Sequence, residues 1–159
     1  MANPGKKFEE DIKKSVPEWC WIYRFKDGTA NFAGEKNSNV RFQAHNICDF
    51  MVMSKDILFL LELKSHKGSS IPFNCIREKQ IEEMSSINHL NIKPMFIFNF
   101  RDKEKTYAVQ AIKVKEFIEG AERKSISIAW CKENGIEIPG KKKITRFRYD
   151  LESLFCGAR

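Results

Sequence analysis

Three residues beside two apolar runs have the types and spacing needed to hydrolyse a phosphodiester. Asp49 lies in the run from 47 to 53, and Glu62-Leu63-Lys64 ends the run that begins at Ile57. A carboxylate that ends a buried strand is costly to desolvate unless it meets a cation or a hydrogen-bond donor. Two carboxylates offer the hard oxygen ligands that Mg²⁺ prefers, and an ammonium beside them suits a phosphate substrate.

The register of a hairpin decides whether these groups meet. If Lys55-Asp56 is a two-residue turn, Ser54 pairs with Ile57, and Asp49 faces Glu62 with Cβ atoms about 4.5–5.5 Å apart. Lys64 is two residues further on and projects from the same face as Glu62. Lys-Asp is a poor pair for a primed turn, and a one-residue slip breaks the alignment. A plain charge cluster, in which Lys64 only neutralises Glu62, stays open as an alternative.

The pattern acid-x-Lys occurs three times, at Asp11-Ile12-Lys13, Glu62-Leu63-Lys64 and Glu122-Arg123-Lys124. Only the second ends a strongly apolar strand, whereas the other two lie in segments typical of a solvated helix or turn. The second is therefore the one that predicts a buried site.

Two helices offer further polar side chains. At about 100° per residue, Glu9 lies roughly 60° from the centre of the first helix's apolar stripe and can face the edge of the core. Glu10 and Asp11 are expected in solvent. Gln80 occupies an apolar face of a later helix, where a polar side chain needs a partner. Its alternative role is to cap a backbone group of the core.

These residues require a scaffold of alternating helices and strands. The pattern predicts a mixed α/β domain with one central sheet over residues 1–159, and a long polar loop at about 26–46. Helices are expected from Asn3-Pro4 to Pro17 and over 74–89, 112–118 and 149–155. Strands are expected over 20–25, 47–53, 57–63, 93–100, 106–110 and 125–130, and a basic loop at 141–143.

Composition narrows the classes of protein. Among 159 residues, 28 Lys and Arg against 21 Asp and Glu give a net charge of +7, which favours a polyanionic partner such as nucleic acid. Five cysteines without a C-x-x-C pair argue against a disulfide framework or zinc cluster and fit a reducing cytoplasm. The longest apolar run, residues 57–61, is too short for a membrane span, and no secretory signal is expected.

The chain resembles the PD-(D/E)xK nucleases, and among them the RecU-type Holliday junction resolvases. The resemblance rests on Gly5-Lys6-Lys7-Phe8-Glu9, Asp49, Glu62-Leu63-Lys64, the stretch 65–73, Gln80-Ile81-Glu82-Glu83-Met84 and Arg123-Lys124-Ser125-Ile126. It is densest over residues 47–84. It implies a restriction-endonuclease-like fold, with a mixed central β-sheet flanked by helices.

The resemblance also implies roles. Asp49 and Glu62, with the backbone carbonyl of Leu63, are expected to bind Mg²⁺, for which Mn²⁺ substitutes. Lys64 is expected to activate water and stabilise charge, Glu9 to hold a water, and Gln80 to position Lys64 or the water. The expected reaction is paired nicking of four-way DNA junctions by a homodimer, which leaves 5′-phosphate and 3′-hydroxyl ends.

The expected DNA contacts are basic or polar residues along the chain: Lys6, Lys7, Lys13, Lys36, Arg41, His66, Lys67, Ser69, Lys141, Lys142 and Lys143. The chain departs from the family in two ways: the interval from Lys26 to Cys48, where the family has a protruding stalk, is shortened, and the basic N-terminal arm is almost absent. Both departures bear on substrate choice, because in the family the stalk and the arm are expected to engage the junction. A nuclease for duplex, flapped or single-stranded DNA is one alternative. A non-catalytic DNA-binding module is another, but the complete set of acidic, lysine and glutamine residues argues against it.

Overall fold

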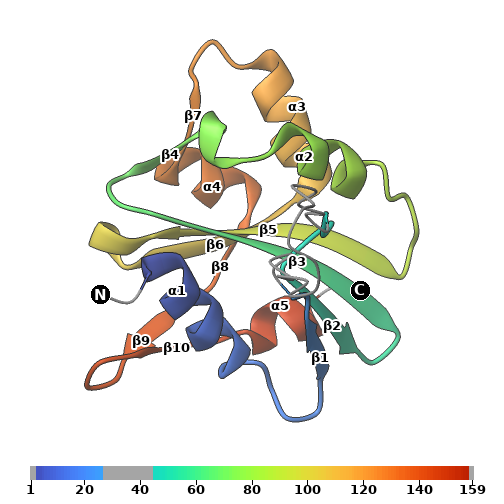
Figure 1. The fold of residues 1–159 in the computed structure, drawn as a ribbon, viewed down its shortest axis with the longest axis vertical. Helices are drawn as coiled ribbons and strands as arrows, with labels where there is room; N and C mark the ends of the chain where they lie inside the picture. The colour runs from blue at the N-terminus through green and yellow to red at the C-terminus, as the bar shows by residue number, and fades with distance from the viewer. Residues whose placement is uncertain (1–2, 27–44, 158–159) are drawn as a thin grey trace, which may run out of the picture.

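A six-stranded mixed sheet organises the molecule. The computed structural model describes residues 3–26 and 45–157, and the sheet has the order β1-β2-β3-β5-β6-β8 (Figure 1). β3 and β5 run parallel at its centre, and the other neighbours are antiparallel. The sheet strands are β1 (Trp21–Arg24), β2 (Phe50–Ser54), β3 (Ile57–His66), β5 (Ile92–Phe100), β6 (Lys105–Gln110) and β8 (Ile136–Glu137).

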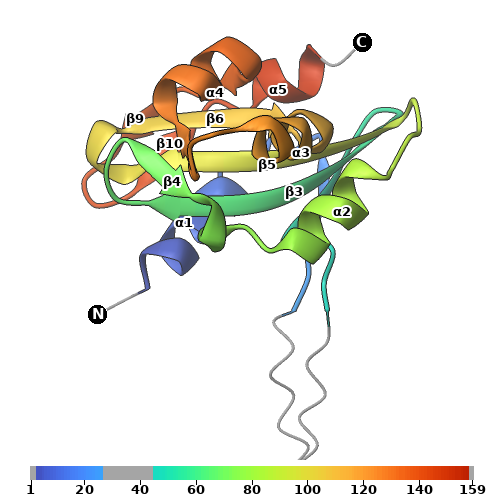
Figure 2. The same ribbon diagram turned by 90° about the horizontal axis from the view of Figure 1, so that it is seen from above.

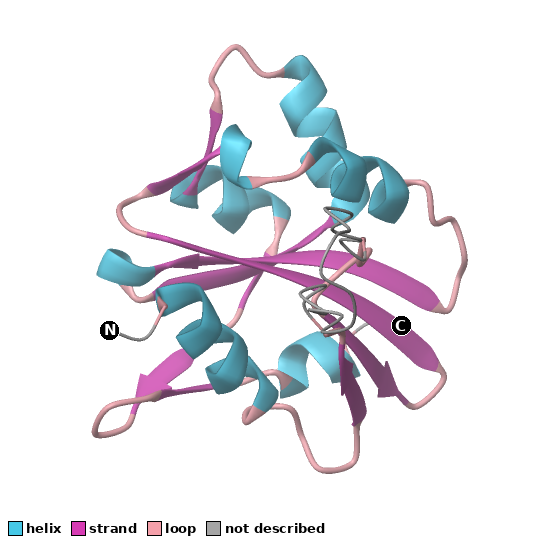
Figure 3. Ribbon diagram, viewed as in Figure 1, coloured by secondary structure: helices cyan, strands magenta, loops and turns pink. Residues whose placement is uncertain are grey.

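Helices cover both faces of this sheet (Figures 1 and 3). One core lies under α1 and α5, and the other lies under α2, α3 and α4. The helices are α1 (Pro4–Lys13), α2 (Glu78–Ser85), α3 (Ala111–Gly120), α4 (Ile128–Asn134) and α5 (Glu152–Cys156). Two small sheets, β4 (Ser70–Pro72) with β7 (Ser125–Ser127) and β9 (Gly140–Lys142) with β10 (Phe147–Tyr149), complete the restriction-endonuclease-like arrangement. None of the described helices is long and apolar enough to cross a membrane.

The predicted hairpin register is confirmed. β2 and β3 pair from Ser54–Ile57 to Phe50–Leu61, and the turn between them has Lys55 at a φ of 54°. The pairing ends one residue before Asp49, whose backbone N–H donates to the Leu61 carbonyl at 3.0 Å. The extrapolated register predicted Asp49 inside the ladder, opposite Glu62. In the structure Asp49 lies one residue beyond the last pair of the ladder.

β3 continues beyond its partner. It pairs with β5 as far as His66–Phe100, whereas β2 pairs with it only as far as Leu61. On the β2 side, residues 62–66 have no paired strand within the described part of the chain. We call this segment the open edge of β3. Helices α1 and α2 flank the open edge from opposite faces of the sheet (Figures 1 and 2).

Several predicted elements differ at their ends. The helix expected over 74–89 is a 3₁₀ turn (Phe73–Cys75) followed by α2, and the first helix ends at Lys13. The strand expected over 125–130 stops at Ser127, whose hydroxyl accepts the Trp130 N–H and caps α4. Most of the loop predicted at 26–46 lies outside the described residues.

The C-terminal region was predicted wrongly as a loop and one helix. The basic loop expected at 141–143 lies largely in β9, paired with β10, and the last helix begins at Glu152, after Tyr149 has already joined β10. β9 pairs with β10, which follows within a few residues. The run of lysines gave no sign of this pairing in the sequence pattern.

Asp11 was predicted in solvent, and this was wrong. Its side chain is buried on α1, where Oδ1 accepts from Arg146 Nε at 2.6 Å and Oδ2 accepts from the Phe147 N–H at 3.4 Å. Both partners come from the far end of the chain, so the helical spacing alone could not indicate them. Glu10 is exposed as expected and contacts the same Arg146.

Candidate active site

Asp49, Glu62 and Lys64 come together just before the first residue of β2, where the open edge of β3 begins. Lys64 Nζ lies 2.7 Å from Glu62 Oε1, and Asp49 Oδ2 accepts the Leu63 backbone N–H at 2.7 Å. The side chain of Glu62 is only 4% exposed and that of Lys64 16%. The hairpin and the parallel pairing with β5 thus fix two acids and one lysine where the pairing of β3 with β2 ends, while β3 itself continues to His66.

The two carboxylates are held in an environment that disfavours their charges. Burial, and then the neighbouring charge of Glu62, raises the pKa of Asp49 to about 7, although the Leu63 N–H lowers it. Burial also raises the pKa of Glu62, against the lowering effect of Lys64. One ammonium therefore does not compensate buried Glu62 and half-buried Asp49 together, and a further cation would stabilise both as carboxylates.

Two buried oxygen atoms strengthen this conclusion. Glu62 Oε2 and Gln80 Oε1 have no hydrogen-bond donor among the described residues. The Leu63 carbonyl points to the open edge as well, because the N–H and C=O of one strand residue face the same side and this N–H meets Asp49. Buried acceptors without donors are uncommon in proteins.

These oxygens fit a hard divalent cation. Two carboxylates and one carbonyl leave positions for water and substrate phosphate, as Mg²⁺ prefers. Within residues 3–26 and 45–157, no group of three or more His, Cys, Asp or Glu side chains is placed to hold a metal. The donor set therefore suits Mg²⁺ better than a fully protein-ligated ion such as structural zinc.

Glu9 lies near this group but has its own partner. Its Oε2 accepts from Arg24 Nε at 3.0 Å and from Arg24 Nη2 at 2.6 Å, and its charge adds to the forces that raise the pKa of Asp49. Arg24 ends β1 opposite Phe50, the residue after Asp49. Sequence reasoning missed Arg24; its signal was a single charged side chain at the end of the aromatic run 20–25.

Gln80 projects from α2 and is 4% exposed. Its Nε2 donates to the Asn46 carbonyl at 3.5 Å, so the alternative of capping a backbone group is present in the structure. The Gln80 side chain also lowers the pKa of Glu62, which places it at the acidic group as well. Gln80 thus connects the segment before Asp49 with the carboxylates.

The predicted DNA-binding residues separate into three places. Lys6, Lys7 and Lys13 are exposed on α1, and Lys67 and Ser69 are exposed in the turn after β3. His66 ends β3 with a buried Nδ1 that lacks a partner among the described residues. Lys141, Lys142 and Lys143 are exposed on the hairpin that packs against α1. Lys36 and Arg41 lie outside the described residues.

Comparisons with known proteins identify the family and the fold of the chain. The family model described as "RecU: Recombination protein U" matches residues 3–149. The SPbeta prophage-derived uncharacterized protein YotM of Bacillus subtilis (strain 168) is 34% identical over 172 aligned positions, which cover 98% of this chain and 86% of that protein. The solved structure of Hjc, a Holliday junction resolvase from Archaeoglobus fulgidus, is similar with a TM-score of 0.51 at 14% identity, covering 84% of this chain and 95% of Hjc.

Proposed function

The chain belongs to the Recombination protein U (RecU) family, and from this premise we propose that it is a Mg²⁺-dependent endodeoxyribonuclease that resolves four-way DNA junctions. The observation that carries the proposal is the pair of acids, half-buried Asp49 and buried Glu62, beside Lys64 on a strand edge left open on one side. The similar fold of Hjc, which is a Holliday junction resolvase, supports the choice of substrate.

The chain's own residues account for most of the proposed mechanism. Asp49, Glu62 and the Leu63 carbonyl would hold Mg²⁺, which supplies Lewis-acid polarisation of the scissile phosphate. Lys64, fixed by its ion pair with Glu62, would orient the attacking water as an ammonium or, as a free amine, accept its proton, and would stabilise the charge that develops on the phosphate. Gln80 positions Lys64 or this water. Glu9, held by Arg24, orders a further water at the edge of the site.

The products follow from the direction of attack. Water adds to phosphorus and the bond to the 3′ oxygen breaks, which leaves a 5′-phosphate and a 3′-hydroxyl. Two such nicks at symmetric positions separate a junction into two duplexes. A two-fold homodimer presents two sites of matching polarity, and we propose that the chain acts in this form.

Basic residues on α1, on the turn after β3 and on the β9–β10 hairpin, which packs against α1, would neutralise DNA phosphates. Such contacts carry no sequence information and make affinity fall steeply with salt. Selection of a junction over duplex must therefore depend on shape.

The test is incubation of the protein with a labelled four-way junction and a matched duplex, in Mg²⁺, Mn²⁺, Ca²⁺ or EDTA. We expect junction cleavage in Mg²⁺ and Mn²⁺, binding alone in Ca²⁺ and no cleavage in EDTA. Ca²⁺ accepts more ligands at longer distances and does not hold the water in line. Cleavage at full rate in EDTA contradicts the metal mechanism. Equal cleavage of junction and duplex by a monomer in sedimentation favours the general-nuclease alternative.

A further inference from the structure

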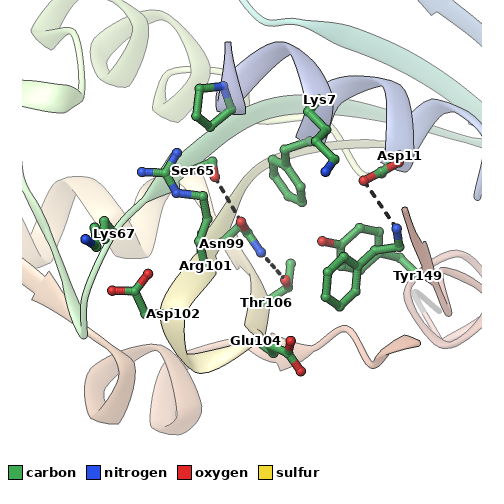
Figure 4. A pocket seen from close by; sticks show the side chains of 13 residues that line it. Lys7, Asp11, Ser65, Lys67, Asn99, Arg101, Asp102, Glu104, Thr106 and Tyr149 are labelled. Carbon is green, nitrogen blue, oxygen red and sulfur yellow. Dashed lines mark hydrogen bonds between the residues drawn. The ribbon is translucent and has the colours of Figure 1, made fainter. Parts of the chain in front are cut away.

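A cavity lies on the α1 face of β3, and the candidate active site lies on the opposite face. It has a volume of about 510 Å³ and is enclosed by α1, the ends of β3 and β5, the start of β6, and β10 (Figure 4). Ser65, which lines it, directly follows Lys64, and successive strand residues point to opposite faces. The cavity has the size of a small-ligand site. Because Ser65 and Lys64 point to opposite faces, the thickness of β3 separates the cavity from the acidic group.

Its interior carries a buried carboxamide. Asn99 is 6% exposed; its Oδ1 accepts from Ser65 Oγ at 2.9 Å, and its Nδ2 donates to Thr106 Oγ1 at 2.9 Å (Figure 4). A carboxamide has two N–H donors and two acceptor lone pairs, so one donor and one acceptor stay available after these bonds. Such a donor–acceptor pair matches the hydrogen-bonding edge of a nucleobase.

Aromatic rings form one wall. Phe147 and Tyr149 stack with centroids 6.0 Å apart, and Phe8 meets the edge of Tyr149 at 5.5 Å. Burial raises the pKa of Tyr149 to about 12, so its hydroxyl is neutral at physiological pH. Phe8 and Tyr149 are buried, so half-buried Phe147 is the ring of this wall that offers most surface to a base. Stacking on an aromatic ring accepts the flat face of any base and contributes strongly to the binding of unpaired strands.

Positive charge lies around the cavity. Lys7 and Lys67 are exposed and Arg101 is half-buried, and Figure 4 shows Arg101 and Lys67 at one side and Lys7 at the other. Two exposed carboxylates, Asp102 and Glu104, also line it, whereas Asp11 is paired with Arg146. Three cations against two unneutralised acids favour an anionic group such as a backbone phosphate.

We propose that this cavity holds one unstacked nucleotide of the bound DNA, with its base between the aromatic wall and Asn99 and its phosphate at Lys67 and Arg101. The inference rests on the proposed function, because a DNA strand bound beside Lys64 would reach the cavity at Ser65 only by crossing the open edge of β3. A base is easiest to extrude where it is already unpaired or poorly stacked, as beside a branch point. The cavity would thereby help to recognise junction shape.

The first test measures affinity in EDTA, by fluorescence anisotropy, for a set of junctions that each lack one base near the branch. We expect one position to weaken binding about fivefold or more, as for the loss of a stacked base, and its neighbours to have little effect. Asn99→Leu should remove this positional difference. Arg101→Ala leaves the buried bonds intact and should weaken binding overall, whereas Lys132→Ala, exposed on α4, should not. Equal affinity for every abasic junction overturns the proposal.

The second test needs neither cleavage nor a junction. Titration of the wild-type protein with deoxyadenosine monophosphate should shift the Asn99 side-chain amide resonance in NMR spectra, whereas deoxyribose 5-phosphate should shift it much less. Equal shifts with both contradict a base site. If Asn99 responds but the protein neither cleaves nor prefers junctions, the proposed function fails and the cavity stands. If junctions are cleaved with no base dependence, the proposed function stands and the cavity proposal fails.

Discussion

Two acidic groups, Asp11 on one face of the sheet and half-buried Asp49 with buried Glu62 on the other, are stabilised in different ways. Asp11 has a donor on each oxygen, from the Arg146 side chain and the Phe147 backbone. Asp49 and Glu62 share one ammonium, and Glu62 Oε2 is buried with no donor in the described part of the chain. The first group is complete without a ligand. The second is not, and this difference distinguishes a structural ion pair from a site that needs a further partner.

The comparison is tested most strongly by neutralising each acid. Asp49→Asn and Glu62→Gln should abolish cleavage and leave DNA binding unchanged or tighter, because each removes negative charge that faces phosphate. Nicking and gel-shift affinity are measured side by side. Asp11→Asn is the control and should retain cleavage per folded molecule. Wild-type rates in both site variants would place the active site elsewhere.

Lys64 has a matched control in the third acid-x-Lys pattern. Lys64→Ala should lower the cleavage rate by roughly 10²–10⁴, as expected for the loss of a group that transfers protons. Lys124, exposed after α3, should tolerate alanine with little change. Single-turnover rates on the junction compare the two variants directly. The opposite order of effects would contradict the assignment of Lys64.

Arg146 should matter for stability and not for chemistry. Arg146→Met leaves Asp11 buried without its main partner and should lower the midpoint of thermal unfolding by at least about 5 °C. Arg148→Met, on the exposed side of the same hairpin, is the control. Cleavage by folded Arg146→Met protein at low temperature should be close to normal. A fully stable Arg146→Met protein that cannot cleave would reverse the roles given to the two groups.

The site acids should reduce the stability of the metal-free protein at neutral pH. The folded-state pKa of Asp49 is about 7, above the roughly 3.9 of an unfolded chain. Its stabilising contribution is therefore complete below about pH 4 and is lost as the pH rises to about 7. In EDTA, Asp49→Asn should unfold about 3 °C or more above wild type at pH 8, with a smaller gap at pH 4.5. If the difference in unfolding midpoint between Asp49→Asn and wild type is the same at pH 8 and pH 4.5, the raised pKa of Asp49 is contradicted.

The sequence predicted the half of the molecule whose contacts are local. The β2–β3 register followed from a two-residue turn, and the two apolar runs placed Glu62 on a buried strand, although that strand continues to His66 and not only to residue 63. Residues close in sequence fix these contacts. Helical spacing singled out Glu9 and Gln80, and the family resemblance gave them roles and added the Leu63 carbonyl.

The contacts that could not be predicted join distant segments. Asp11 is buried because Arg146 reaches it from 135 residues away, and Glu9 is held by Arg24 on the edge strand. The cavity beside Asn99 likewise combines α1, β5 and β10. No helical or strand period reports such pairings, because the partner's position depends on how the whole chain packs. Polar side chains on apolar faces, such as Gln80, were the available local signal.

The open edge of β3 has a consequence for how the protein behaves at high concentration. An unpaired strand edge is a template on which another chain can add a strand, and proteins protect such edges with charged side chains. Here Asp49 occupies the Leu63 N–H, and Lys64 and Lys67 place charge along and just beyond the same segment. The residues proposed to cut DNA are thus also positioned to keep the sheet from growing into an aggregate.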